Sequence, residues 1–146
     1  FASSFSRKPS ATGGTQAGLL VGSAGSPGGP PPTRIEGVLV ARPARELRPA
    51  IEAMLAPLGV LAGTAVAANA VVLDERQLGE GYGRPTAAAG EAADLLARTE
   101  GILVDPIYTA KALAGLIAAI RSGQHDGQTV LFWHAGGTPG IFEPLD

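Results

Sequence analysis

The sequence predicts an α/β fold in which a mostly parallel sheet lies between layers of flanking helices. The chain has 146 residues and is 45% hydrophobic, which is enough for one compact core. Its apolar residues are mainly Ala, Val, Leu and Ile, with only 5% aromatic residues, so they suit helices that pack closely on a sheet. Short apolar runs alternate with segments of helical spacing, and this order indicates parallel strands joined by right-handed crossovers.

The start of the chain is expected to contribute little to this core. Residues 1–10 are rich in serine and contain no apolar run, so we expect an irregular lead-in to a domain over residues 11–146. A helix is expected to begin after the glycine turn and to include Gln16–Val21. The segment Ser26–Pro32 is expected to be a surface loop, because proline supplies no backbone donor and glycine favours turns.

The middle of the chain predicts strand and helix in alternation. Ile35–Ala41 has the composition of a buried strand. The next segment, Pro43–Pro57, is expected to be a helix whose apolar face consists of Leu47, Ile51, Met54, Leu55 and, just beyond it, Leu58. A second short apolar run, Ala70–Leu73, predicts another strand, and Gly79–Pro85 is expected to form a loop.

The last part predicts two more helices and two more strands. Thr86 can cap a helix that runs through Arg98. The compact run Ile102–Val104 is expected to be a strand. The helix after Asp105 and Pro106 has an apolar stripe at i, i+3, i+4 and i+7, formed by Leu113, Leu116, Ile117 and Ile120. The final strand is expected over Thr129–Trp133.

Composition excludes several classes of partner and site. Eleven basic and thirteen acidic side chains give a formal charge of -2 without a long block of either sign, so we expect no binding to nucleic acid or anionic lipid. The chain has no cysteine, which excludes disulfides and thiolate ligands for a metal. Its apolar stretches are shorter than the roughly 20 residues of a spanning helix. We therefore expect a cytoplasmic protein with no membrane segment.

The glycine turn Thr12-Gly13-Gly14-Thr15 is a candidate phosphate site. Ligands of an open parallel sheet bind outside the carboxyl ends of its strands, where helices begin. The glycines would let a phosphate approach the backbone amides, and the two threonines would add hydroxyl donors. A Gly-Gly turn before a helix is, however, commonly only a turn, and this one matches neither a Walker A loop nor a dinucleotide fingerprint.

Both tyrosines of the chain lie in expected loops. Tyr82 is flanked by glycines and could project from an adaptable backbone, although an ordinary connector with an exposed tyrosine would look the same. Tyr108 could stack on a flat cofactor, with Thr109 hydrogen-bonded to it. Alternatively, Asp105 caps the helix and Tyr108 packs in the core.

The two histidines do not indicate a metal site. His134 follows an apolar strand and is expected to be a structural, hydrogen-bonded residue. His125 lies in a polar turn and is expected to be exposed. Their spacing and the absence of nearby carboxylates do not suit zinc, so no metal is expected. A Gly-X-Ser-X-Gly nucleophile elbow is also missing from the sequence.

Taken in order, these loops resemble the D-cysteine desulfhydrase and 1-aminocyclopropane-1-carboxylate deaminase family. The segments that carry the resemblance are Ala11–Gly18, Gly79–Gly83, Arg98–Lys111 and His134–Gly137. The likeness implies the fold of type II pyridoxal-phosphate enzymes, which are similar to the tryptophan synthase β subunit. The lysine that forms a Schiff base with the cofactor, and a nucleophilic serine, are expected upstream of this chain.

The resemblance also implies roles for individual residues. The cofactor phosphate would be held by Thr12, Gly13, Gly14 and Thr15. Tyr108 would lie beside the pyridine ring, and Tyr82 near the substrate. Thr109 would lie near the ring nitrogen, and Gly136 in a loop at the cofactor that has Ala135 where the family usually has Thr. Lys111 is expected to be a surface residue.

The activity implied by the resemblance is a β-elimination that converts a small amino acid, most like D-cysteine, to pyruvate, ammonia and sulfide. The deaminase branch has a glutamate at the position of Thr109, so the neutral Thr109 favours the desulfhydrase branch. The family also implies a homodimer. Two alternatives are a catalytically incompetent fragment that at most binds phosphate, and an unrelated phosphate-binding α/β module. Neither Lys8 nor Lys111 is a convincing substitute for the Schiff-base lysine.

Overall fold

A four-stranded parallel sheet organises the chain. The computed structural model describes residues 4–10, 12–24, 34–134 and 136–142, so the expected loop Ser26–Pro32 lies outside the described residues. The sheet has the order β3-β2-β1-β4, and every paired neighbour is parallel. Its strands are β1 (Ser4–Ser10), β2 (Arg34–Leu39), β3 (Val72–Asp74) and β4 (Thr129–Phe132).

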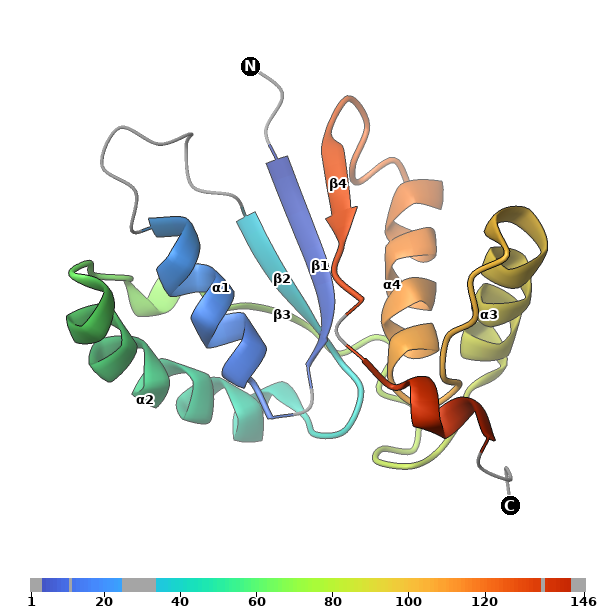
Figure 1. Cartoon of the computed structure of the whole chain (residues 1–146), viewed down its shortest axis with the longest axis horizontal. Helices are drawn as coiled ribbons and strands as arrows, with labels where there is room; N and C mark the ends of the chain where they lie inside the picture. Colours follow the sequence, from blue (N-terminus) through green and yellow to red (C-terminus); the bar gives the residue numbers. More distant parts are fainter. Residues whose placement is uncertain (1–3, 11, 25–33, 135, 143–146) are drawn as a thin grey trace.

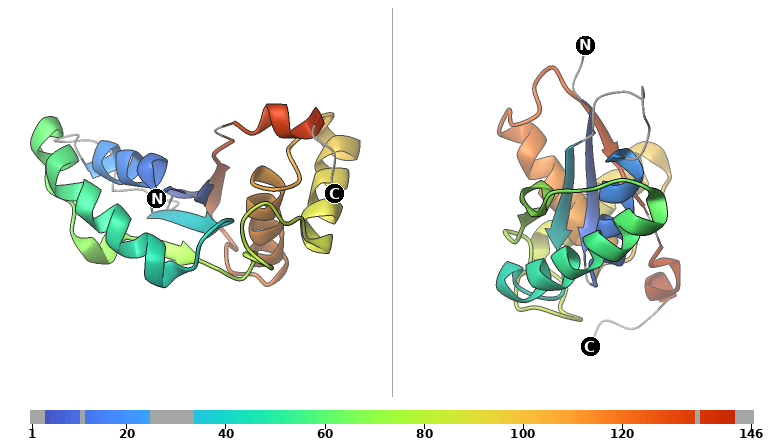
Figure 2. Two further views of the ribbon diagram at one scale, coloured as in Figure 1. Left: turned by 90° about the horizontal axis from the view of Figure 1, so that it is seen from below. Right: turned by 90° about the vertical axis from the view of Figure 1, so that its left-hand side faces the viewer.

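Helices cover both faces of this sheet, as the sequence predicts (Figure 1). The helices are α1 (Gly14–Ala24), α2 (Ala44–Ala62), α3 (Ala87–Glu100) and α4 (Thr109–Arg121), with short 3-10 helices η1 (Ala68–Ala70) and η2 (Thr138–Phe142). Seen along the sheet, α1 and α2 lie on one side, whereas α4 lies on the other with α3 outside it (Figure 2). No described helix is long and apolar enough to cross a membrane.

The expectation of an irregular lead-in is wrong for residues 4–10. Ser4–Ser10 is β1, which pairs with β2 on one side and β4 on the other. Side-chain composition gave no sign of this strand, because it has Ser, Arg, Lys and Pro where a buried parallel strand is usually apolar. Backbone hydrogen bonding to two neighbours does not require apolar side chains, and it places β1 in the middle of the sheet.

Other differences concern short apolar runs. The predicted strand Ile102–Val104 is irregular: Ile102 and Leu103 are exposed, and Val104 packs with Ala89 and Ala110. The run joins α3 to α4 outside the sheet, where it has no strand neighbour. A three-residue apolar run therefore could not distinguish a strand from a packed connection.

Apolar clusters lie on both faces of the sheet. The predicted face of α2 packs with α1 and the sheet through Leu47, Ile51 and Leu55. On the other face, Leu113 and Leu116 of α4 pack with Ala92 of α3. The predicted start of α3 is confirmed, since the Thr86 hydroxyl accepts a hydrogen bond from Ala89 N at 3.1 Å.

Candidate functional site

Most of the predicted site residues follow the carboxyl ends of strands. The start of α1 follows β1, the loop Gly79–Gly83 follows β3, and Gly136 follows β4. The start of α4 lies at the same edge of the sheet (Figure 1). The topology thus brings the predicted loops to the edge where parallel α/β sheets bind ligands.

The glycine turn before α1 is shaped by packing beneath it. Gly13 is buried with φ 84°, and a Cβ at this position would overlap the Ile51 side chain of α2. Thr12, Gly14 and Thr15 are exposed, and a Cβ on Gly14 would meet no described atom within 4 Å. The first turn of α1 carries no acidic residue. Its backbone therefore faces open space at the positive end of the helix dipole.

A buried glutamine fixes this helix start to the sheet. Gln16 is fully buried, and its Nε2 donates to Val72 O at 2.8 Å. The Ser10 hydroxyl donates to Gln16 Oε1 at 3.4 Å. A Cβ at Gly37 would overlap Gln16 Oε1, so a larger residue in β2 would displace the glutamine side chain. The sequence gave no indication of this role for Gln16, because a polar residue in the first turn of a helix is usually exposed.

The start of α4 is already occupied by a carboxylate. Asp105 is 1% exposed, and its oxygens accept hydrogen bonds from the amides of Ile107 at 3.1 Å, Tyr108 at 2.6 Å and Thr109 at 3.0 Å. Asp105 therefore caps the turn that leads into α4, as one of the two interpretations expected, although Tyr108 is the residue at the N-cap position and is only partly buried. A Cβ at Gly137 would overlap Asp105 Oδ2, so the loop after β4 packs directly on this cap.

Two predicted cofactor residues are joined beside the cap. The Thr109 hydroxyl donates to Gly136 O at 3.1 Å, and the Thr109 side chain is almost completely buried. A hydroxyl has one proton, so in this arrangement the Thr109 oxygen has only lone pairs to offer to another group. Thr109 therefore links α4 to the loop after β4.

The two tyrosines also come together. The ring centroids of Tyr82 and Tyr108 are 5.9 Å apart with an interplanar angle of 66°, which is an edge-to-face contact. Tyr82 is 70% exposed, whereas Tyr108 is partly buried at the start of α4. Thr12 and Gly13 precede α1, and Gly14 and Thr15 begin it; α1 lies on the opposite face of the sheet from α4 (Figure 2). The predicted residues thus form a tyrosine pair and a Thr109–Gly136 pair near α4, and a separate turn at α1.

The expectation that Lys111 lies at the surface is wrong. Lys111 is fully buried, and its Nζ donates to Leu78 O and Gly81 O, each at 3.0 Å. Burial lowers the pKa of this ammonium group. The available signal was the apolar character of α4 around its whole circumference, which is typical of a buried helix. His125 is likewise buried rather than exposed, with Nδ1 3.2 Å from Gln128 Oε1.

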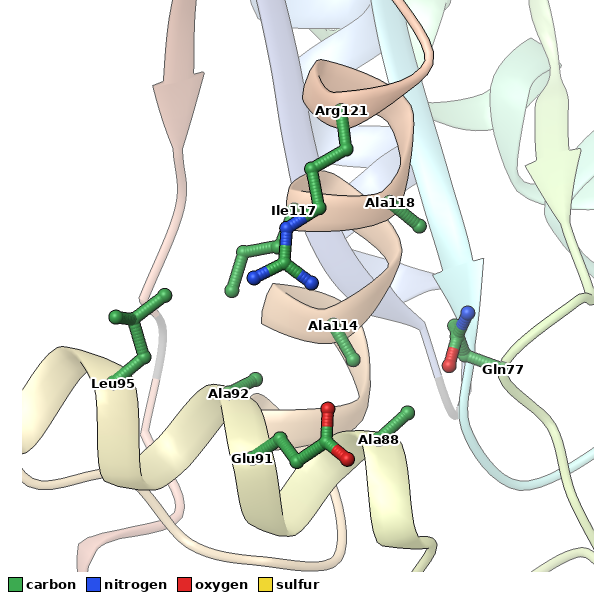
Figure 3. Close-up of a pocket in the computed structure, with 9 residues that line it drawn as sticks. All are labelled: Gln77, Ala88, Glu91, Ala92, Leu95, Ala114, Ile117, Ala118 and Arg121. Atoms are coloured by element: carbon green, nitrogen blue, oxygen red, sulfur yellow. The ribbon is translucent and has the colours of Figure 1, made fainter.

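A separate groove lies between α3 and α4 (Figure 3). It has a volume of about 270 Å³, and Glu91 and Arg121 are the charged side chains in its lining. None of the predicted site residues lines this groove. The described residues also contain no group of three or more His, Cys, Asp or Glu side chains that could hold a metal ion.

Comparisons with known proteins agree with the resemblance seen in the sequence. D-cysteine desulfhydrases of Salmonella typhi and Salmonella newport are each 41% identical to this chain over 135 residues. The aligned region is 91% of this chain but 40% of each relative, so the chain spans two fifths of their length. A solved structure described as an ACC deaminase homologue matches with a TM-score of 0.80 and 28% identity, over 94% of this chain and 41% of that one.

A family model matches most of the chain. The model described as "Pyridoxal-phosphate dependent enzyme" matches residues 8–136, a range that includes the turn before α1, both tyrosines and Gly136. The open start of α1 fits a phosphate group, since Thr12, Gly14 and Thr15 are exposed, Gly14 has free space around it, and the first turn has no acidic side chain. The predicted fold class and cofactor are thereby confirmed, and this chain belongs to the family of pyridoxal-phosphate-dependent enzymes.

Proposed function

We propose that this chain is the cofactor-holding part of a pyridoxal-phosphate-dependent lyase that acts on D-cysteine or a closely similar small amino acid. The observation that carries the proposal is the 41% identity to D-cysteine desulfhydrases across 91% of the chain. The overall reaction is a β-elimination in which D-cysteine and water give pyruvate, ammonia and hydrogen sulfide. This reaction is proposed for the whole enzyme, because the chain corresponds to only 40% of the length of these relatives.

In this proposal the start of α1 binds the cofactor phosphate. Its exposed turn would donate hydrogen bonds from the backbone of Gly13, Gly14 and Thr15 and from the hydroxyls of Thr12 and Thr15. Anions at helix starts gain both from free N–H groups and from the helix dipole. The Gln16 contacts support this role, because they hold the helix start in a fixed position on the sheet.

The residues near α4 would orient the ring and the substrate. When bound, pyridoxal phosphate supplies an electron sink for negative charge on the amino acid's α-carbon. Tyr108 would pack beside the ring, and the exposed Tyr82 would place its hydroxyl near the substrate. Thr109 and Gly136 would line the ring-nitrogen side of the site, held together by their hydrogen bond.

The test of this proposal is turnover by the natural gene product that carries residues 1–146. The purified protein is supplied with pyridoxal phosphate, and release of pyruvate and sulfide is measured with D-cysteine and with L-cysteine. We expect faster release from D-cysteine, and a lower kcat in Tyr82→Phe. Ammonia release from 1-aminocyclopropane-1-carboxylate without reaction of D-cysteine would contradict the desulfhydrase assignment and favour the deaminase.

The proposal extends to assembly and location. We propose that the enzyme is a homodimer, as the family resemblance implies. We also propose that it is located in the cytoplasm. Association with another polypeptide is supported by exposed apolar surface at Leu131, in the edge strand β4, and at Trp133, just after it. Sedimentation of the natural protein tests the assembly, and a monomer at micromolar concentration would contradict it. Fractionation of the source cells tests the location, and recovery of the protein outside the cytoplasm would contradict it.

A further inference from the structure

We propose that Lys111 is a positioning residue whose ammonium group holds the loop Gly79–Gly83 against α4, so that Tyr82 stays beside Tyr108. This inference rests on the proposed function, in which both tyrosines adjoin the cofactor and substrate. The supporting observations are the burial of Lys111, its two carbonyl contacts and the composition of the loop.

The contacts of Lys111 bracket the start of the tyrosine loop. Its Nζ donates to Leu78 O, immediately before the loop, and to Gly81 O, immediately before Tyr82. The side chain is fully buried, although lysine is almost never buried without partners for its ammonium group. A hydrogen bond from a charged donor is about twice as strong as a neutral one. The two carbonyls therefore stabilise the buried ammonium, and the ammonium fixes both ends of the turn.

The loop needs such an external anchor. Gly79, Gly81 and Gly83 have φ values of 61°, 111° and 72°, which glycine adopts without steric strain. Glycine also loses more conformational entropy on ordering than other residues, so this segment has little intrinsic preference for one shape. Within the loop, Gly81 N donates to Leu78 O at 3.2 Å. Leu78 O thus serves both the turn and Lys111.

The anchor and the ring contact start from the same rigid helix. Lys111 lies three residues after Tyr108, in the first turn of α4 that Asp105 caps. Tyr82 meets Tyr108 edge to face, and the backbone just before Tyr82 is held by Lys111. The loop therefore contacts α4 through the ring of the exposed Tyr82 and through the ammonium group of the buried Lys111. Because Lys111 is buried, its contact is the one that we expect to fix the position of the loop.

Hydrogen exchange of the natural protein tests this inference. In Lys111→Met the methylene packing is retained but both donors are lost, and we expect exchange of the Leu78–Arg84 amides to accelerate about tenfold or more. Cleavage by chymotrypsin after Tyr82 should accelerate in parallel. Lys111→Arg keeps a charged donor and should restore most of the protection. Arg121→Met removes a cation from the exposed end of the same helix and should leave the loop unchanged.

Unchanged exchange of the Leu78–Arg84 amides in Lys111→Met would overturn the inference. An equal acceleration throughout α4 and the sheet would also overturn it, because that result indicates only a general loss of stability. If Lys111→Met does not fold, Lys111→Gln replaces it, since its amide can still donate to one carbonyl. An intermediate exchange rate in Lys111→Gln is then expected, and wild-type protection would contradict the anchoring role.

Kinetics separate this inference from the proposed function. With D-cysteine, Lys111→Met should lower kcat at least tenfold and leave the affinity for pyridoxal phosphate unchanged, because the turn at α1 is not disturbed. If the wild-type protein does not act on D-cysteine, the proposed function fails, and the exchange experiment alone decides whether Lys111 anchors the loop. Loss of cofactor affinity with kcat unchanged would contradict a role through Tyr82.

Discussion

The starts of α1 and α4 lie at the same edge of the sheet, and each is the positive end of a helix, but only the start of α4 has a carboxylate of the protein bound to it. At α4, the buried Asp105 carboxylate accepts hydrogen bonds from the amides of Ile107, Tyr108 and Thr109. At α1, the first turn has no acidic residue, and the Gly14 backbone faces open space. One helix start is saturated by the protein's own anion, and the other is available to an external one.

This difference follows from a few residues. An aspartate before α4 supplies an anion from within the chain, and Gly137 allows the next loop to close over it. The threonines and glycines at the start of α1 supply only neutral groups, and Gln16 holds the helix start to the sheet. A helix start that is held in place but carries no anion of its own can accept an external one, and the proposed phosphate site at α1 rests on this difference.

The largest expected effect concerns Gly13. A side chain there requires a left-handed conformation and overlaps Ile51, so Gly13→Ala should lower the free energy of unfolding by about 3 kcal/mol. Gly14→Ala is the matched control, because its φ is not positive and its Cβ has space; it should be neutral or raise stability slightly. Urea unfolding of both variants measures the difference. Equal destabilisation would show that the turn is not held by its contact with α2.

The next effect concerns the cap of α4. Asp105→Ala leaves one buried and two partly buried amides without this acceptor and should lower the free energy of unfolding by about 2 kcal/mol. Asp105→Asn keeps one acceptor oxygen and should lose less. Chemical denaturation with circular dichroism checks both variants. A loss of less than about 0.5 kcal/mol, as for an ordinary surface substitution, would mean that α4 does not need the Asp105 carboxylate.

A smaller effect is expected at the link between α4 and the loop after β4. Thr109→Val removes the hydrogen bond to Gly136 O while keeping the shape, and should lower the free energy of unfolding by about 1 kcal/mol. Thr109→Ser retains the hydroxyl and provides the control. Thermal unfolding compares the two. If Thr109→Val matched the wild type while Thr109→Ser did not, packing of the methyl group would be the important contact instead.

The smallest effect is the pH dependence caused by Lys111. Burial lowers its pKa in the folded state, so between that lowered value and the ordinary lysine value the unfolded state binds more protons. The free energy of unfolding of the wild type, relative to Lys111→Met, should therefore rise with pH through this alkaline window. Urea unfolding at a series of pH values measures the difference. A constant or falling difference would contradict the lowered pKa.

The sequence predicted most of the architecture, since helical spacing and short apolar runs identify the layers and the parallel sheet. The central strand β1 was missed because pairing on both edges, rather than side-chain type, makes Ser4–Ser10 a strand. The opposite error occurred at Ile102–Val104, where an apolar run has no strand to pair with. Strand assignment fails in both cases because it depends on neighbours that are distant in sequence.

The candidate site was predictable by motif order but not by contacts. The glycine turn, the tyrosines, Thr109 and Gly136 could be chosen from the sequence, and the structure joins Tyr82 to Tyr108 and Thr109 to Gly136. The supporting roles of Gln16 and Lys111 were not predicted. Polar side chains are normally placed at the surface, and their burial depends on specific backbone carbonyls supplied by other segments.

The most direct test of the comparison is cofactor binding at the start of α1. Equilibrium dialysis of pyridoxal phosphate against the wild type and Gly14→Ala, with inorganic phosphate as competitor, measures whether the exposed turn holds the anion. We expect Gly14→Ala to keep its stability and bind pyridoxal phosphate at least tenfold more weakly, with phosphate competing in the wild type. Unchanged affinity in Gly14→Ala, together with no competition by phosphate, would contradict the assignment of this helix start as the phosphate site.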